Sequence, residues 1–468
     1  MGPVESLKYF IPELVLLGGA FFVFLTDFFV KNKKVVKNLA LLTLTLALCF
    51  CKEPSQPLDL FYGFFHLDAF ANVFRFFALI AVAVTLLLTY SYSHLRIRYE
   101  GELYGLFLFI AFGLILIGAA NNLLMIFLAV EFVSLISYLL VGFLKENIKA
   151  KESAIKYLLF GSVCSGIMLY GMSLLYGVSG SLDLSVIGAA LNPASLKPLA
   201  LVATLCFFAG LGFKVSMAPF HMWAPDVYEG APTPITAFLT VAPKALGFAV
   251  LMRVLSTVFG AFYAEWTLVL TALSILTMTI GNLGAISQTN MKRFLAYSSI
   301  AQAGYILMGL AVFSQLGKEA VLIYLLAYIF TNLGAFAVAV FVEERTGSED
   351  LASYAGLSKR SPAAAALLTI FLLSLTGIPP LAGFIGKYYV FAAAIEARFI
   401  TLAVAAAINS AVAAYYYFRV IRLMYLTPAT EPSLARPSFS SQAAIWLMFT
   451  GVMAVGVFPA FFIKLLFG

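Results

Sequence analysis

The chain has 468 residues, of which 62% are hydrophobic and 11% are charged, and its mean hydropathy is +0.99. Soluble globular domains carry about 25% charged residues, so these figures exclude a soluble protein and indicate an integral membrane protein. The net charge of +7 fits lysines and arginines in the cytoplasmic loops of such a protein, and it gives no reason to expect nucleic-acid binding.

Long apolar runs between polar breaks predict fourteen membrane-spanning helices, and therefore an all-α polytopic fold. We expect the spans at residues 10–30, 38–51, 67–90, 103–120, 122–144, 157–177, 199–220, 235–259, 264–288, 295–313, 320–343, 363–397, 399–424 and 441–466. The first run has no small-residue cleavage site after a short apolar core, so we interpret it as a retained span and not as a signal peptide.

The lysines and arginines in the loops and near the ends of the spans indicate how the chain is oriented. The odd-numbered loops hold 18 of these residues, and the opposite face holds 7. Because positively charged loops stay in the cytoplasm, we expect both termini on the periplasmic side of a bacterial inner membrane.

Two of the predicted spans are interrupted by proline, and each contains a lysine. Lys214 stands five residues before Pro219, and Lys387 stands seven residues after Pro380. Proline removes a helical N–H group, and irregular backbone is tolerated at membrane depth only beside protein or water. A lysine before one break and after the other is expected of two five-helix units that run in opposite directions, as in transporters.

Four ionisable residues are predicted inside the bilayer, namely Glu131, Lys214, Lys244 and Lys387. Left unpaired, they would cost on the order of 10 kcal/mol, so we expect each to be paired or hydrated. Burial stabilises the neutral form of a lysine, which suits a proton carrier better than a metal ligand. The alternative interpretation is a structural Glu–Lys pair that braces helices, or lysines whose ammonium groups reach the lipid headgroups.

Charged residues nearer the N-terminus are given structural roles. Asp68 and Arg75 are spaced i, i+7 on one predicted helix, and we expect them to form a salt bridge. Glu13 lies near the end of the first span and is expected to be solvated.

Several classes of site have no motif in the sequence. The four cysteines form no CxxC pair and the three histidines are scattered, so we expect no zinc, haem or iron–sulfur site and no metal ligands. The glycine-rich loops that bind nucleotides and the nucleophile elbow of acyl-transfer enzymes do not occur either.

Three stretches resemble the subunit N family of respiratory complex I, the proton-translocating NADH:quinone oxidoreductase. They are FKVSMAPFHMWAPDVYEGAPTPITAFLTVAPKALGFAVLMR at 213–253, QTNMKRFLAYSSIAQAGYILMGL at 288–310 and SLTGIPPLAGFIGKYYVF at 374–391. The run DVYEGAPTP at 226–234 is more similar to subunit N than to the related antiporter-like subunits L and M. The count of fourteen spans also agrees with this family, so the resemblance covers essentially the whole chain.

The resemblance implies a division into N-terminal helices (1–100), a first five-helix repeat (101–260), a second, inverted repeat (261–425) and a C-terminal helix (426–468). It also implies a translocase subunit without redox catalysis of its own. NADH, FMN, the iron–sulfur clusters and quinone would all be bound by partner subunits. The implied partners are protons, membrane lipids and other membrane-arm subunits, among them M, K and J.

Residue by residue, the resemblance gives Glu131, Lys214, Lys244 and Lys387 the places of the family's proton-translocating residues on its fifth, seventh, eighth and twelfth spans. Glu131 and Lys214 would be the modulating pair. Gln302 is given no role. The alternatives are a subunit of a multi-subunit sodium/proton antiporter, a purely structural membrane-arm subunit, and the homologous subunit of a ferredoxin-fed quinone reductase.

Overall fold

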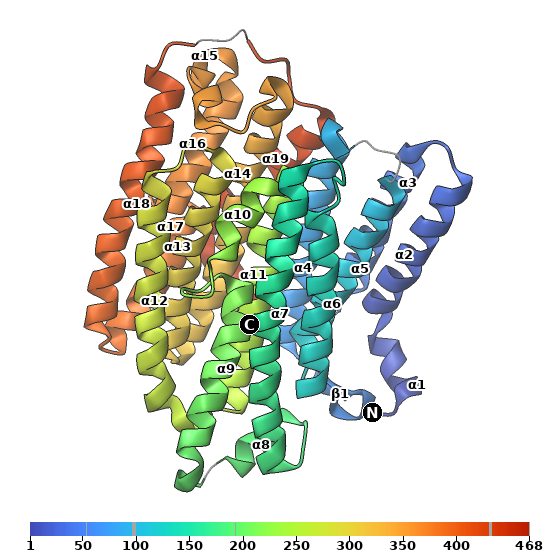
Figure 1. Cartoon of the computed structure of the whole chain (residues 1–468), viewed down its shortest axis with the longest axis vertical. Helices are drawn as coiled ribbons and strands as arrows, with labels where there is room; N and C mark the ends of the chain where they lie inside the picture. Colours follow the sequence, from blue (N-terminus) through green and yellow to red (C-terminus); the bar gives the residue numbers. More distant parts are fainter. Residues whose placement is uncertain (53, 96–99, 192, 430–432, 468) are drawn as a thin grey trace. The chain divides into compact units, whose positions relative to one another are not determined.

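The computed structural model describes all residues except 53, 96–99, 192, 430–432 and 468, and the described chain is almost entirely helical (Figure 1). It divides into two compact units. Unit 1 comprises Met1–Leu86, His94–Val215 and Ala242–Trp266, and unit 2 comprises Leu87–Ser93, Ser216–Val241 and Thr267–Gly468.

Unit 1 contains the N-terminal helices, one hairpin and the helices up to the first break. Its helices are α1 (Pro3–Ser6), α2 (Ile11–Phe29), α3 (Lys33–Phe50), most of α4 (Ala69–Ser91), α5 (Glu100–Ala119), α6 (Leu123–Val141), α7 (Ile148–Ser179), α8 (Leu184–Ala190), α9 (Lys197–Val215) and the later part of α11 (Thr233–Thr257). Its strands β1 (Leu58–Leu60) and β2 (Phe65–Leu67) pair antiparallel with Asp59 opposite His66.

Unit 2 contains the short helix after the first break and nearly all of the C-terminal half. Its helices are α10 (Trp223–Gly230), the start of α11, most of α12 (Tyr263–Ile286), α13 (Met291–Val312), α14 (Gln315–Thr346), α15 (Leu357–Arg360), α16 (Pro362–Thr376), α17 (Ala382–Glu396), α18 (Ile400–Leu426), α19 (Phe439–Val457) and α20 (Pro459–Phe467). Single 3₁₀ turns in the whole chain are η1 (Leu7–Tyr9), η2 (Phe61–Gly63), η3 (Ser93–Leu95), η4 (Ala194–Leu196), η5 (Gly260–Phe262) and η6 (Leu351–Tyr354).

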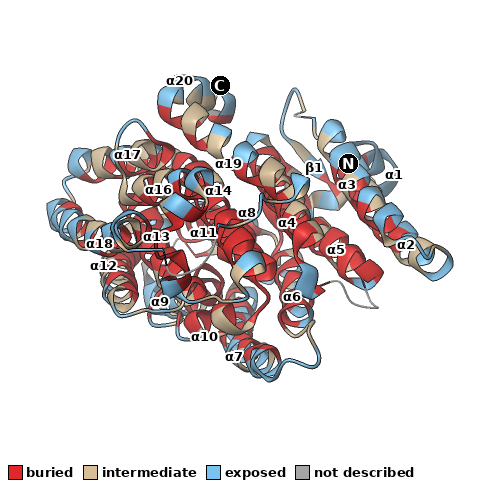
Figure 2. Cartoon of the chain, turned by 90° about the horizontal axis from the view of Figure 1, so that it is seen from above, coloured by how far each residue is buried: buried red, intermediate tan, exposed pale blue. Residues whose placement is uncertain are grey.

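Burial separates central helices from peripheral ones (Figure 2). Helices α13 and α14 are buried almost throughout, whereas α18 and α19 expose one face that is still apolar. A helix that is hydrophobic all round belongs in the centre of a helical membrane protein, and an exposed apolar face suits contact with lipid.

The predicted spans agree with the structure. Among the residues that the structure describes, twelve helices are long and apolar enough to cross a membrane, and each overlaps one predicted span. The two further spans correspond to α3 and to the broken pair α16–α17.

Both predicted breaks are present. Helix α9 ends at Val215, one residue after Lys214, and the chain resumes as α10 at Trp223. Helix α16 ends at Thr376, and α17 starts at Ala382 with Lys387 in its second turn. The lysine therefore precedes the first break, where the chain leaves unit 1, and follows the second break, within unit 2, as expected.

Two loops repeat the same construction in the two units. In unit 1, Asn122 caps α6 and pairs with Asp183, just beyond α7. In unit 2, Asn290 caps α13 and pairs with Asp350, just beyond α14. Both α7 and α14 have 32 residues and end at a glycine with positive φ, Gly180 and Gly347.

The hydroxyl contacts around these glycines match as well. The backbone N–H of Ser181 bonds to the Ser179 hydroxyl, and the N–H of Asp183 bonds to the Ser181 hydroxyl. The segment Thr346–Asp350 makes the same two bonds, from Ser348 to Thr346 and from Asp350 to Ser348. The chain thus contains an internal structural repeat, which supports the predicted two-repeat fold.

The predicted Asp68–Arg75 salt bridge is wrong. Arg75 of α4 is instead paired with Glu13 of α2, and both side chains are at most 1% exposed, so Glu13 is not solvated as expected. Asp68 bonds to Arg253 at 3.2 Å. A seven-residue spacing on one helix leaves two side chains two turns apart, too far for Asp68 and Arg75 to pair directly. Each therefore pairs with a residue of a helix that is distant in the sequence.

A second buried ion pair joins α3 to α5 in the same N-terminal group of helices. Lys37 Nζ lies 3.1 Å from Glu100 Oε2, and both side chains are less than 10% exposed. Removing one partner of a buried pair leaves an uncompensated charge and costs about 3–5 kcal/mol, so these two pairs specify how α2, α3, α4 and α5 associate.

Candidate functional site

Glu131 projects from the middle of α6, where its carboxylate is half-buried. Ser165 of α7 donates a hydrogen bond of 2.5 Å to Glu131 Oε1. The structure therefore provides a hydrogen-bond partner for this half-buried acid from a neighbouring helix.

Lys214 lies in the last turn of α9 and is 7% exposed. Its Nζ donates to Ser134 Oγ at 2.5 Å, and it lies 5.2 Å from the centroid of the Phe213 ring. Ser134 in turn donates to the backbone oxygen of Val130 at 2.5 Å. The lysine is thus held by a hydroxyl of α6 and by the face of its neighbouring aromatic ring.

Glu131 and Lys214 are brought together through α6. Ser134 is three residues after Glu131 and therefore on the same helical face, and Glu131 acts electrostatically on Lys214. Among the described residues, however, the two form no direct ion pair, because each side chain binds a serine. The predicted pair therefore consists of two ionisable groups, each bonded to a different serine hydroxyl, and we name Glu131, Ser165, Ser134 and Lys214 the Glu131–Lys214 relay.

Lys244 lies in α11 directly after Pro243 and is 2% exposed. Gly247, three residues on and so on the same face, packs against α9. A Cβ at this glycine would lie 2.8 Å from Val215 Cγ1 and 3.3 Å from Lys214 Cβ. The missing side chain allows the part of α11 that carries Lys244 to approach the end of α9 that carries Lys214.

Lys387 belongs to unit 2 and is 6% exposed. Its Nζ donates to the backbone oxygen of Thr376 at 2.8 Å and to Ser410 Oγ at 3.2 Å, and it lies 4.5 Å from the centroid of the Tyr305 ring. The last carbonyls of a helix have no partner within it, so the break after α16 supplies one acceptor for the lysine.

Gly377 makes room for the stem of Lys387 at this break. Its φ is +93°, and a Cβ there would lie 2.7 Å from Lys387 Cδ. Both the backbone conformation and the close approach require glycine, so the glycine of the interrupted helix positions the lysine as well as ending α16.

Sequence reasoning missed the polar partners of the four residues. Ser134, Ser165 and Ser410 each bind one of the ionisable groups. The spacing of Ser134 from Glu131 was the available signal, since residues i and i+3 share a face of a helix. The other two serines gave no signal, because serine is frequent between membrane helices for reasons of packing alone.

The arrangement can hold and exchange protons inside the bilayer. Three buried lysines and one carboxylate are present, and three of the four contact a hydroxyl, which can donate one proton and accept another. Buried ionisable side chains of this kind mark ion or proton pathways in membrane proteins.

Comparison with known proteins gives one family and a consistent set of relatives. Residues 120–413 match the model of a family described as NADH:quinone oxidoreductase/Mrp antiporter, transmembrane. The chain is 42% identical to NADH-quinone oxidoreductase subunit N 2 of Sorangium cellulosum, over 97% of this chain and 95% of that protein.

Two solved structures illustrate the range of the likeness. A chain of respiratory complex I from Thermus thermophilus with bound aureothin has a TM-score of 0.83 and 32% identity, covering 97% of this chain and 98% of that one. A chain of the Mrp complex from Dietzia has a TM-score of 0.84 but 20% identity, covering 99% and 96%. The second comparison therefore concerns the fold alone.

Proposed function

Because the chain belongs to the NADH:quinone oxidoreductase/Mrp antiporter transmembrane family, we propose that it acts as the proton-translocating subunit N of an NADH:quinone oxidoreductase. The observation that carries the proposal is the placement of Glu131 and Lys214, each bonded to a serine hydroxyl, with Ser134, the partner of Lys214, three residues from Glu131 on α6. The 42% identity to a protein named subunit N supports the assignment within the family.

In this proposal the redox reaction takes place in partner subunits, which bind NADH, FMN, the iron–sulfur clusters and quinone. Moving one proton against 100 mV requires about 2.3 kcal/mol. Quinone reduction in the partners supplies this energy and alters the charge state of Glu131 and Lys214. That alteration changes the proton affinity of Lys244, and the proton then passes toward Lys387.

The Glu131–Lys214 relay suits this coupling step for a physical reason. A carboxylate near an ammonium stabilises its charge, and moving the carboxylate away favours release of the proton. Since Glu131 and Lys214 bind serines and not each other, small changes at α6 or α7 would alter their interaction without first breaking a direct salt bridge. The relay would then act as the adjustable part of the pathway.

We further propose that the protein lies in the inner membrane of a bacterium with both termini periplasmic. Its partners would be the other membrane-arm subunits, including M, K and J, and membrane lipids. The excess of lysine and arginine in the odd-numbered loops supports this orientation.

Substitution Lys214→Ala in the assembled complex tests the proposal. We expect NADH-driven proton pumping to fall at least about tenfold, as for loss of a residue that transfers protons, while NADH:ferricyanide reduction by the partner subunits continues. Lys197→Ala is the matched control, because Lys197 lies on the same helix, is 53% exposed and pairs with Glu265 at the surface. Equal pumping by both variants would contradict the proposal.

The fold shared with a Mrp complex chain makes a sodium/proton antiporter subunit the second candidate. Purification in mild detergent with identification of partners separates the two. Recovery with NADH-oxidising and iron–sulfur subunits supports the proposal. Recovery with small antiporter subunits alone, together with sodium-driven proton exchange, would replace it.

A further inference from the structure

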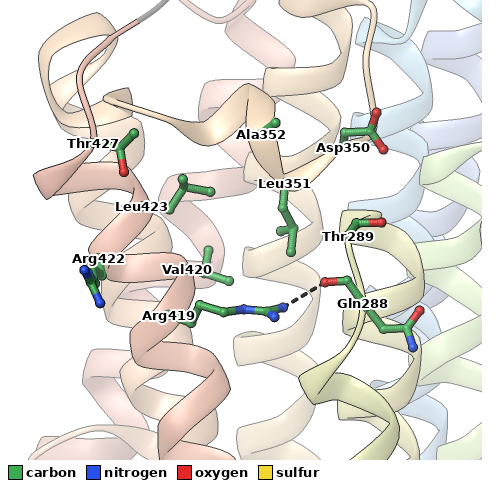
Figure 3. A pocket seen from close by; sticks show the side chains of 10 residues that line it. All are labelled: Gln288, Thr289, Asp350, Leu351, Ala352, Arg419, Val420, Arg422, Leu423 and Thr427. Carbon is green, nitrogen blue, oxygen red and sulfur yellow. Dashed lines mark hydrogen bonds between the residues drawn. The ribbon is translucent and has the colours of Figure 1, made fainter.

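A pocket lies at the C-terminal end of α18, within unit 2 (Figure 3). Its volume is about 650 Å³, and three segments line it: the end of α18, the loop between α12 and α13, and the segment that follows α14. The polar residues among its lining are Arg419, Arg422, Gln288, Thr289, Asp350 and Thr427. None of these residues takes part in the proposed proton pathway.

Two arginines of α18 bring positive charge to the pocket. Arg419 extends toward the α12–α13 loop (Figure 3), where its guanidinium donates to the backbone oxygens of Ile286 at 2.5 Å and Gln288 at 2.8 Å. Two of its five N–H groups are used in this way, which leaves three for another acceptor. Arg422 is exposed, and among the described residues no hydrogen bond or ion pair engages its guanidinium. The pocket therefore offers unused guanidinium donors.

The other polar side chains at the pocket are one acid and three neutral groups. Asp350 lies across the pocket from Arg422 (Figure 3), so the lining carries two positive charges and one negative charge. Gln288, Thr289 and Thr427 add an amide and two hydroxyls. Guanidinium groups bind phosphate through two parallel N–H···O bonds. The lining therefore suits a phosphate group that carries further polar groups, such as hydroxyls, which the acid and the amide can bind.

The exposed face of α18 is apolar until it reaches these arginines. Val404, Ile408 and Tyr415 are 53%, 61% and 64% exposed, and spacings of four and seven residues place them on one face of the helix. Arg419 and Arg422 follow Tyr415 by four and seven residues and so continue the same face. Because Arg422 also lines the pocket, the pocket borders the apolar face of α18.

Helix α12 lies beside α18 and adds a second apolar strip. Asn409 of α18 donates to Thr279 Oγ1 of α12 at 3.2 Å, and Arg419 binds the last residue of α12. Leu276 and Leu283 of α12 are 42% and 57% exposed. Exposed apolar side chains of this kind suit contact with lipid chains, and here two neighbouring helices present them next to one pocket.

The pocket lies at the level where lipid headgroups are expected. The predicted spans of α12 and α18 end at residues 288 and 424, close to Gln288 and Arg422. Basic residues gather at this end of unit 2, namely Lys292, Arg293, Arg345, Lys359 and Arg360. By the distribution of positive charge, this end faces the cytoplasm. Basic pockets between membrane helices on the cytoplasmic side are suited to anionic lipid headgroups.

A pair of arginines at the end of a membrane helix has a simpler explanation, because long basic side chains reach the headgroup level without binding any particular lipid. Three features go beyond it. The guanidinium groups border a cavity, neutral hydrogen-bonding groups lie beside them, and an apolar face leads to them from the membrane interior. A soluble anion would use the arginines and the cavity but would leave the apolar face uncovered, whereas a phospholipid uses all three features.

We propose that the pocket binds the headgroup of one anionic phospholipid, whose acyl chains lie along the exposed apolar side chains of α12 and α18. Arg422 and the remaining N–H groups of Arg419 bind the phosphate, and hydroxyls of the headgroup bond to Asp350 and Gln288. The inference rests on the membrane placement and orientation given under the proposed function, and it requires no proton translocation by the chain.

The first experiment measures phospholipid contact in the assembled complex. The complex is placed in phosphatidylcholine vesicles with a trace of phosphatidylglycerol that carries a photoactivatable group in its acyl chain, and labelled peptides are counted by mass spectrometry. We expect Arg422→Gln to lower labelling of α12 and α18 about fivefold, as for loss of one cationic group at a membrane surface. Lys359→Gln is the matched control, because Lys359 is exposed at the same end of unit 2 and does not line the pocket. Equal labelling of the two variants would overturn the proposal.

The second experiment uses the unsubstituted complex, so it does not depend on how a variant folds. Unlabelled phosphatidylglycerol, phosphatidylethanolamine, phosphatidylcholine and inorganic phosphate are added in turn as competitors. We expect phosphatidylglycerol alone to reduce the labelling of α12 and α18. An equal reduction by either of the other two lipids, or by inorganic phosphate, would overturn an anionic phospholipid site. Absence of labelling on both helices would mean that another subunit covers this face, and it would overturn the proposal as well.

The labelling is measured without NADH, which separates failure of this site from failure of the proposed function. If Arg422→Gln loses labelling while Lys214→Ala pumps normally, the lipid site stands and the proposed function is wrong. If Lys214→Ala fails to pump while Arg422→Gln and Lys359→Gln are labelled equally, the proposed function stands and the lipid site is wrong.

Discussion

The two interrupted helices place their lysines in different chemical surroundings. Lys214, which belongs to unit 1 and precedes the first break, binds a serine and interacts electrostatically with the carboxylate of Glu131. Lys387, after the break in unit 2, binds a backbone carbonyl, a serine and an aromatic face. The charge on the first lysine can therefore be altered by a neighbouring acid, while the second is held by neutral dipoles.

Because the chain contains an internal repeat, the surroundings of the two lysines can be compared residue by residue. Counted from the capping asparagines Asn122 and Asn290, Glu131 and Ser299 both stand nine residues along their helices. The first repeat has a carboxylate where the second has a buried hydroxyl that bonds to the backbone oxygen of Ala296. The two repeats therefore share a scaffold but differ at this position, where only the first has an acid.

The largest effect is expected from making the first repeat resemble the second. Glu131→Ser replaces the acid with the residue found at the matching position of unit 2 and keeps a hydroxyl within reach of α7. We expect NADH-driven pumping to fall at least about tenfold, measured in vesicles that contain the assembled complex. Normal pumping by this variant would show that the acid at this position of the first repeat is not needed for proton translocation.

A smaller effect is expected at the glycines that end helices in the two repeats. Ala at Gly377 or at Gly180 adds strain of about 1–2 kcal/mol, because both residues have positive φ. Only at Gly377 does the new Cβ meet a functional side chain, since Gly180 has open space around it. Gly377→Ala should reduce pumping about threefold, and Gly180→Ala should lower only thermal stability. Equal pumping defects would contradict this assignment.

The smallest effect is expected from loss of one hydroxyl in the relay. Ser134→Ala removes the oxygen that accepts from Lys214, and a hydrogen bond to a charged group contributes about 1.5–3 kcal/mol. Because water can replace much of it, we expect pumping to fall only about twofold. Ser173→Ala on α7 is the control, because this exposed serine bonds to the backbone oxygen of Tyr170 on its own helix. An unchanged rate in Ser134→Ala would exclude the hydroxyl from the relay.

The features set by hydrophobicity and proline were predictable from the sequence. The spans followed from apolar runs, and both breaks followed from Pro219 and Pro380. The four buried ionisable residues were found because a charge within an apolar run is costly and therefore rare. These signals are local, and each can be detected within one span.

The features set by packing between distant segments were not predictable in the same way. The partner of Arg75 is Glu13, 62 residues away. The seven-residue spacing between Asp68 and Arg75 had led to the wrong prediction. Gln302, which was given no role, bonds to Tyr417 and accepts from Tyr324. One similarity between distant segments is nevertheless visible in the sequence. Ser179–Asp183 and Thr346–Asp350 each contain a serine or threonine, then Gly-Ser, and an aspartate in the last place.

The Glu13–Arg75 pair has a consequence for how the protein is made. Helix α2 leaves the ribosome before α4, and at 5–20 residues per second the 62 residues between the partners take roughly 3–12 s to synthesise. During that interval the acid of the first membrane helix has no arginine to neutralise it. The order of synthesis therefore favours holding α2 and α3 at the insertion machinery until α4 and α5 arrive, so that the N-terminal helices enter the lipid as a group and not one by one.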